Sequence, residues 1–218
     1  MDLWLFDFGH FPESLANSIL DTFPPSIADS IRRFRRMEDK KSRIIARLLI
    51  QKYVTDQSKF WDWNTWMENE HHKPGIKGGP FFSISHSGTK VLVGFSETAE
   101  IGVDLEEIKP IDVSVLMQYF HPTEKAFLSA NAYDLNHFYA IWTKKEAVLK
   151  ASGIGLLKGL DHLNVLDQDP SVNRLLTEIN LGPEFKCAVC SLSEGTETKL
   201  HLIDHNILNK FIHEKILL

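Results

Sequence analysis

The sequence predicts an α+β protein built from two similar halves, because helical patterns followed by strand patterns occur twice along its 218 residues. The first series ends in strand-like segments between residues 81 and 105, and the second ends in strand-like segments between 162 and 192. A content of 43% hydrophobic and 24% charged residues is ordinary for a globular chain with its own core. We therefore expect halves over 1–100 and 101–218, each with helices packed on a small, mainly antiparallel sheet.

In the first half, residues 2–8 are rich in apolar and aromatic side chains and predict a strand. Helices are expected over 12–23 and over 26–55, where the pattern allows a break near Met37. Residues 61–79 predict a short strand and a loop through Lys73-Pro74-Gly75. Three strands should follow, over 81–85, 90–96 and 101–105.

In the second half, three helices are expected, over 113–120, 123–130 and 136–152, and Gly153 supplies a stop for the last of them. Strands should then cover 162–166, 174–179 and 185–192. The tail from 200 to 218 is ambiguous and reads as a strand followed by a helix.

Charge and composition exclude several classes of function. The net charge of −5 provides no general field for nucleic acid, so any anion site must be local. No apolar run is long enough to cross a bilayer, and the N-terminus lacks the features of a signal peptide, so we expect a cytoplasmic protein without a membrane partner. Cys187 and Cys190 lie in a strand pattern that would place their sulfurs on opposite faces, which favours buried free thiols over a metal or redox pair.

The stretch from Ile101 to Ile108 carries two acids on an otherwise apolar strand. Because side chains alternate between the faces of a strand, Gly102, Asp104 and Glu106 share one face. By the same parity, Glu107 should point the other way. Taken alone, this pattern also fits an edge strand with a solvated polar face.

Two other stretches could join these acids. Ser85, His86 and Ser87 end an apolar strand with groups that can bind phosphate oxygens, although a lone histidine is more often structural. Glu146 and Lys150 are four residues apart and therefore neighbours on one helix face, where they could also form a surface ion pair of little value. A helix carboxylate added to two strand carboxylates would make an oxygen site suited to Mg²⁺.

Together these motifs resemble the 4′-phosphopantetheinyl transferases, in particular the monomeric class built from two halves. The resemblance rests on Ser83-Ile-Ser-His-Ser87, Ile101-Gly-Val-Asp-Leu-Glu106 and Trp142-Thr-Lys-Lys-Glu-Ala147, followed by Lys150 and Gly153-Ile-Gly155. Order and spacing agree with the family over residues 73–156, and the set is far more specific than any one block. The resemblance implies a pseudo-twofold pair of halves, with coenzyme A bound in the cleft between them.

The resemblance also implies residue roles. Asp104, Glu106 and Glu146 would hold Mg²⁺ against the pyrophosphate of coenzyme A. Glu146 would also act as general base for the serine of an apo acyl, peptidyl or aryl carrier protein, directly or through a water. Lys150 would stabilise the departing 3′,5′-ADP. The remaining coenzyme contacts would come from Lys73, Ser85, His86 and Lys145, with the 3′-phosphate held by one or more of Arg32, Arg33, Arg36 and Arg43.

Three alternatives remain open from the sequence. The basic run from Arg32 to Arg43 could simply be a solvated helix face. The apolar side chains between residues 116 and 127 could bind a carrier protein or fill the core of the second half. Finally, the chain could be a coenzyme A or carrier binding module without catalysis, whereas an unrelated nucleotide enzyme is disfavoured because no phosphate-binding glycine motif is present.

Overall fold

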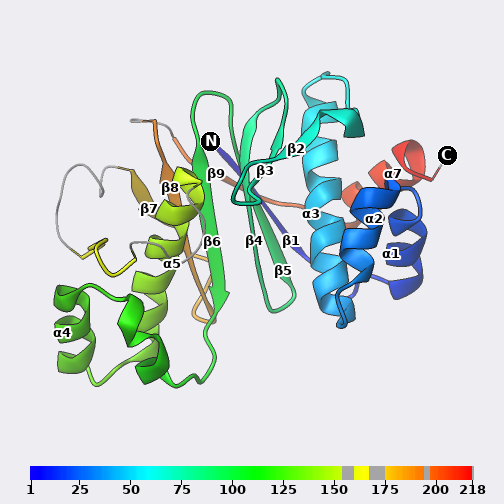
Figure 1. The fold of residues 1–218 in the computed structure, drawn as a ribbon. Helices are drawn as coiled ribbons and strands as arrows, with labels where there is room; N and C mark the ends of the chain where they lie inside the picture. The colour runs from blue at the N-terminus through cyan, green and yellow to red at the C-terminus, as the bar shows by residue number, and fades with distance from the viewer. Residues whose placement is uncertain (154–159, 167–174, 194–196, 218) are drawn as a thin grey trace.

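The computed structural model describes residues 1–153, 160–166, 175–193 and 197–217, and Figure 1 shows their arrangement. The first sheet has the strand order β4-β5-β1-β9. Strand β1 pairs antiparallel with β5 and parallel with β9, while β4 pairs antiparallel with β5. The strands are β1 (Asp2–Asp7), β4 (Phe81–Ser87), β5 (Lys90–Ser96) and β9 (Lys199–Leu202).

Helices cover the outer face of this sheet (Figure 1). The long helix α3 presents a buried apolar stripe, including Ile45, Leu49 and Tyr53, which packs in the same core as aromatic residues of β1 and β5. Pro25 begins a helix whose first position needs no amide hydrogen, and a separate helix begins at Met37, as the sequence allowed. The helices are α1 (Glu13–Leu20), α2 (Pro25–Arg32), α3 (Met37–Asp56) and α7 (His205–Lys215).

A small hairpin follows α3 after the 3-10 turn η1 (Trp63–Thr65). It consists of β2 (Trp66–Glu68) and β3 (Pro74–Ile76), paired antiparallel. The prediction of a loop through Pro74 and Gly75 was therefore wrong. A proline is tolerated there because the sheet has only two strands and Pro74 is the first residue of its strand.

The second sheet has the order β6-β8-β7 and is antiparallel throughout. Helix α5 lies on one face of it, so closely that a side chain at Gly102 would meet the α5 backbone, 1.9 Å from the Ala147 carbonyl oxygen. The helix ends at Gly153, whose φ of 67° is the left-handed cap that the sequence predicted. The elements are β6 (Ile101–Glu107), η2 (Val113–Tyr119), α4 (Pro122–Ala130), α5 (Leu135–Ser152), β7 (Leu176–Glu178) and β8 (Phe185–Ser191).

The two sheets meet through a buried apolar layer between their inner faces. Leu3, Leu5 and Leu92 of the first sheet pack there with Val103 and Leu105 of β6. The strands β6 and β4 lie side by side where the sheets join, with α5 on one side of the molecule and α3 on the other (Figure 1). The observed architecture is therefore α+β, as predicted, with two sheets between two helical layers.

The C-terminal segment returns to the first half. Strand β9 pairs with β1, and Leu208 and Ile212 of α7 are buried in the core beneath α3. The proposed division into 1–100 and 101–218 remains a prediction, but residues 199–215 contribute to the sheet and helical layer of the first half.

Residues 162–166 do not form the predicted strand. The backbone groups of this segment bind buried side chains instead of a neighbouring strand: the Leu163 carbonyl accepts from Lys145, and the Val165 amide donates to Glu124. Other predicted details agree, since Cys187 and Cys190 are free, buried and on opposite faces of β8. Gly155 of the family motif and Arg174 of a predicted strand lie outside the described residues.

Candidate active site

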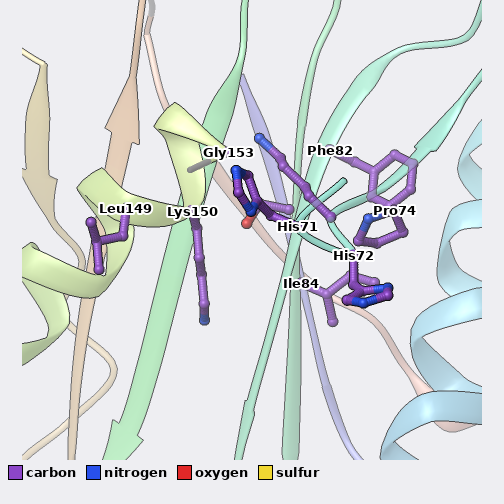
Figure 2. A pocket seen from close by; sticks show the side chains of 10 residues that line it. His71, His72, Pro74, Phe82, Ile84, Leu149, Lys150 and Gly153 are labelled. Atoms are coloured by element: carbon purple, nitrogen blue, oxygen red, sulfur yellow. The ribbon is translucent and has the colours of Figure 1, made fainter. Parts of the chain in front are cut away.

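A cleft of about 280 Å³ lies between the two halves. Leu149, Lys150 and Gly153 border it from the end of α5, and strand β4 and the loop before β3 form the opposite wall (Figure 2). Lys150 points from α5 into the space beside β4 (Figure 2). The residues contributed by the first half are His71, His72, Lys73, Pro74, Phe82, Ser83 and Ile84.

Three carboxylates lie close together at this junction. Asp104 and Glu106 share one face of β6, and Glu146 comes from α5, which packs on that sheet. Removal from water, followed by the negative charge of Asp104, raises the pKa of Glu106 to about 7 and that of Glu146 to about 7. Burial and mutual repulsion therefore both disfavour the fully ionised form of this cluster.

The Lys150 ammonium supplies the nearest positive charge. It donates to Asp104 Oδ1 at 2.7 Å and to Ser85 Oγ at 3.1 Å. The other oxygen of this buried carboxylate, Asp104 Oδ2, has no hydrogen-bond partner among the described residues. In this conformation the described residues include no group of three His, Cys, Asp or Glu side chains arranged to hold a metal ion.

A basic flank extends from Lys150 toward α3. The pKa of His86 is lowered by removal of water and then by the positive charges of Arg43 and Lys150, so its imidazole is neutral at neutral pH. The Arg43 guanidinium stacks on Phe34, 3.6 Å from the ring centroid. Arg36 is instead an exposed residue whose described ion pair is a 3.8 Å contact with Glu38.

Comparison with known proteins gives this junction a context. The profile described as the 4′-phosphopantetheinyl transferase superfamily matches residues 100–204. The 4′-phosphopantetheinyl transferase Sfp of Bacillus subtilis (strain 168) is 31% identical over 182 residues, which cover 77% of this chain and 81% of that protein. The chain belongs to the 4′-phosphopantetheinyl transferase superfamily.

Other members agree with this assignment over most of their length. The 4′-phosphopantetheinyl transferase gsp of Aneurinibacillus migulanus is 28% identical, with 73% of this chain and 72% of the relative covered. The L-aminoadipate-semialdehyde dehydrogenase-phosphopantetheinyl transferase of Mus musculus is 24% identical, with 90% of this chain and 67% of the relative covered. This protein is therefore a phosphopantetheinyl transferase that takes its transferable arm from coenzyme A, and a binding module without catalysis is not favoured.

The structure does not bring every predicted residue of the transferase to the cleft. Lys145 is completely buried and lies 2.6 Å from Glu124, which is also completely buried. A coenzyme contact by Lys145 would require this pair to leave the core. Helical geometry gives the signal that the sequence analysis missed: at roughly 100° per residue, Lys145 projects about 140° away from Lys150.

Lys73 and Ser85 reach the junction, but their polar atoms already have partners. The Lys73 ammonium donates to Glu100 at 2.5 Å and to the Ile101 carbonyl, and it ties the cleft loop to the start of β6. The Ser85 hydroxyl is buried between Asp104, Lys150 and the Leu105 amide. Their predicted coenzyme contacts remain predictions.

Arg47 was not among the residues predicted from the sequence. It lies one helical turn after Arg43, its guanidinium carbon is 5.0 Å from the centroid of Trp66, and its Nε has no partner among the described residues. Burial lowers the pKa of Arg47 to about 10, still far above neutral pH, so the side chain keeps its positive charge on α3 near Arg43. Its spacing from Arg43 was visible in the sequence, but its direction was not.

The described part of the transferase contains no helix with both the length and the apolar character needed to cross a membrane. The predicted carrier-binding side chains divide between two environments. Phe120 is fully buried in a cluster with Phe138 and Ile141, whereas the others are only partly buried against that cluster: Leu116, Met117, Tyr119 and Phe127. Core packing therefore accounts for part of that apolar segment.

Proposed function

We propose that this transferase requires Mg²⁺ and that Asp104, Glu106 and Glu146 hold the ion. The observation that carries the proposal is the grouping of three acids at one junction. There, burial and the negative charge of Asp104 raise the pKa of both glutamates to about 7, and Asp104 Oδ2 has no hydrogen-bond partner among the described residues. A divalent cation with oxygen ligands would neutralise this charge and fill the empty contact. Bound there, Mg²⁺ would supply Lewis-acid stabilisation for the pyrophosphate of coenzyme A.

The surrounding residues fit binding of a polyphosphate. Lys150 lines the cleft and donates to Asp104, and Arg43 adds a second positive charge on the side of α3, near the neutral imidazole of His86. We assign Lys150 to the charge that develops on departing 3′,5′-ADP, because an ammonium placed beside the reacting phosphate lowers the energy of the transition state. Arg43, with Arg47 behind it, is the better candidate for the 3′-phosphate than the outward-facing Arg36.

Glu146 is the proposed general base. Its pKa of about 7 describes the metal-free site and would fall when Mg²⁺ binds, so the assignment rests on the position of Glu146 on α5, packed on β6 near Asp104. The serine oxygen would then form a bond to the β-phosphorus, and the bond to the 3′,5′-ADP oxygen would break. This gives a holo-carrier-protein synthase acting on acyl, peptidyl or aryl carriers.

We also propose that the transferase works as a monomer, because one chain supplies both walls of its cleft. The predicted cytoplasmic location and the absence of a nucleic-acid partner remain predictions.

The test is transfer to apo carrier proteins, followed by mass spectrometry. With coenzyme A and Mg²⁺, a carrier should gain the mass of one phosphopantetheine arm, and Asp104→Asn and Glu146→Gln should each slow the transfer by about 100-fold or more. Glu107→Gln is the matched control, because Glu107 forms a 2.7 Å ion pair with Lys109 and should retain most of the rate. Full activity of either isosteric variant, or of the wild type in EDTA, would contradict the metal assignment.

A further inference from the structure

Strands β4 and β6 are joined by side chains at the junction of the two sheets. Each is the edge strand of its own sheet, so each has one row of backbone groups without a neighbouring strand. The side chains of three serines of β4 lie between the two edge strands and accept hydrogen bonds from alternate backbone amides of β6. The pairs are Ser83 with Val103 at 3.1 Å, Ser85 with Leu105 at 3.1 Å, and Ser87 with Glu107 at 3.0 Å.

We call Ser83, Ser85 and Ser87 the serine seam. In each of the three bonds the amide lies twenty residues after its serine, so the two strands run in the same direction. One serine hydroxyl bridges the strands at each of these three positions. Ser83 and Ser85 are buried, and Ser87 is partly exposed. The seam therefore satisfies edge amides that would otherwise be buried without a partner.

Two members of the seam make a second contact. Ser85 donates to Asp104 Oδ1 at 2.9 Å, and Ser87 donates to Glu106 Oε2 at 2.8 Å. The residue of β6 at the equivalent position beside Ser83 is Gly102, which has no side chain. Two otherwise similar serines thus hold the acids, and the third only joins the strands.

Hydrogen-bond counting makes this arrangement directional. A serine hydroxyl has one proton to donate and can accept from two donors. Because Leu105 N and Lys150 Nζ both donate to Ser85, its single proton is left for Asp104. Hydrogen bonds to a charged acceptor are roughly twice as strong as neutral ones, so they restrict how the carboxylate can rotate.

We propose that Ser85 and Ser87 are positioning residues that orient Asp104 and Glu106 for the metal, whereas Ser83, which bonds to neither acid, joins the two sheets without orienting a ligand. This inference rests on the proposed metal role of the two acids. It predicts that loss of the Ser87 hydroxyl strongly lowers the affinity for the metal but changes the melting temperature little.

The experiment compares Ser87→Ala with Ser83→Ala in the full chain. Each variant loses one seam bond, but only Ser87→Ala releases a carboxylate. Binding of Mn²⁺ alone, measured by electron paramagnetic resonance, should weaken by about 10-fold or more in Ser87→Ala, as for other residues that orient metal ligands. It should change by less than about 3-fold in Ser83→Ala, and Ser87→Thr, which keeps a hydroxyl, should restore it.

Thermal melting and the Mg²⁺ concentration for half-maximal transfer are measured alongside. Equal Mn²⁺ affinity in Ser87→Ala and wild type would overturn the inference while leaving the metal role intact. A wild type that binds no Mn²⁺ would overturn both. If Ser87→Ala does not fold, Ser87→Cys gives the same comparison, because a thiol fills the site but donates weakly.

Discussion

The buried pair of Lys145 and Glu124 allows a quantitative prediction about stability. Both side chains have 0% exposure, and the carboxylate also accepts from the amides of His121 and Val165 at 2.9 Å each. In Lys145→Met the two amide bonds remain, but the negative charge loses its buried countercharge. Removing one partner of such a pair typically costs about 3–5 kcal/mol of unfolding free energy.

Urea unfolding followed by circular dichroism measures this cost. Thermal melting gives a second measurement. For a chain of this length, each kcal/mol of lost unfolding free energy lowers the melting temperature by about 2–4 °C, so we expect a decrease of about 6–20 °C. The double variant Glu124→Gln with Lys145→Met should recover part of the loss, because no charge is left unpaired. Recovery is incomplete because the amide oxygen of Gln can accept from only one of the two backbone amides.

A loss of less than about 1 kcal/mol in Lys145→Met would refute this reasoning, as would a double variant at least as unstable as the two single variants added together. Activity provides a separate check on the site. Below its melting temperature Lys145→Met should still transfer phosphopantetheine, because the side chain does not reach the cleft.

The remaining predictions concern packing and pH. Gly102→Ala should prevent α5 from docking and reduce soluble yield, because the new Cβ would lie 1.9 Å from the Ala147 carbonyl oxygen. Gly75→Ala is the control and should fold normally, because its Cβ would lie 3.6 Å from Met67 Cγ, an ordinary contact distance. Raised pKa values mean that metal-free folded protein holds protons on Glu106 and Glu146 more tightly than unfolded chain does. These groups should therefore lower stability as pH rises from about 4.5 to about 7. Urea midpoints across that range should fall less in Glu146→Gln than in wild type, and identical slopes would contradict the shift.

The alternating pattern around Asp104 made the β6 prediction sound. Strand periodicity is local, so the sequence could place Asp104 and Glu106 on one face with Gly102 before any packing was known. The structure adds the reason for the glycine, which is the close approach of α5. Likewise, Gly153 could be recognised as a helix stop because a left-handed cap is a property of the chain itself.

The prediction of a strand over 162–166 was wrong because the partners of this segment are set by residues distant in the sequence. Its apolar residues fit a strand pattern, but the backbone partners were decided by the buried Lys145 and Glu124 far away in sequence. The C-terminal strand and helix were expected as elements, yet no local signal showed that they would pack on the first half.

The sequence alone therefore predicted most of the elements, the family and the shared face of Asp104 and Glu106, because these depend on short-range periodicity and on motif spacing. Only the tertiary structure decided that Lys150 faces Asp104 while Lys145 enters the core, and that Ser83, Ser85 and Ser87 meet alternate amides of β6. Such pairings depend on how two sheets and a helix come into register. That register is set by packing across the whole molecule and leaves no local pattern in the chain.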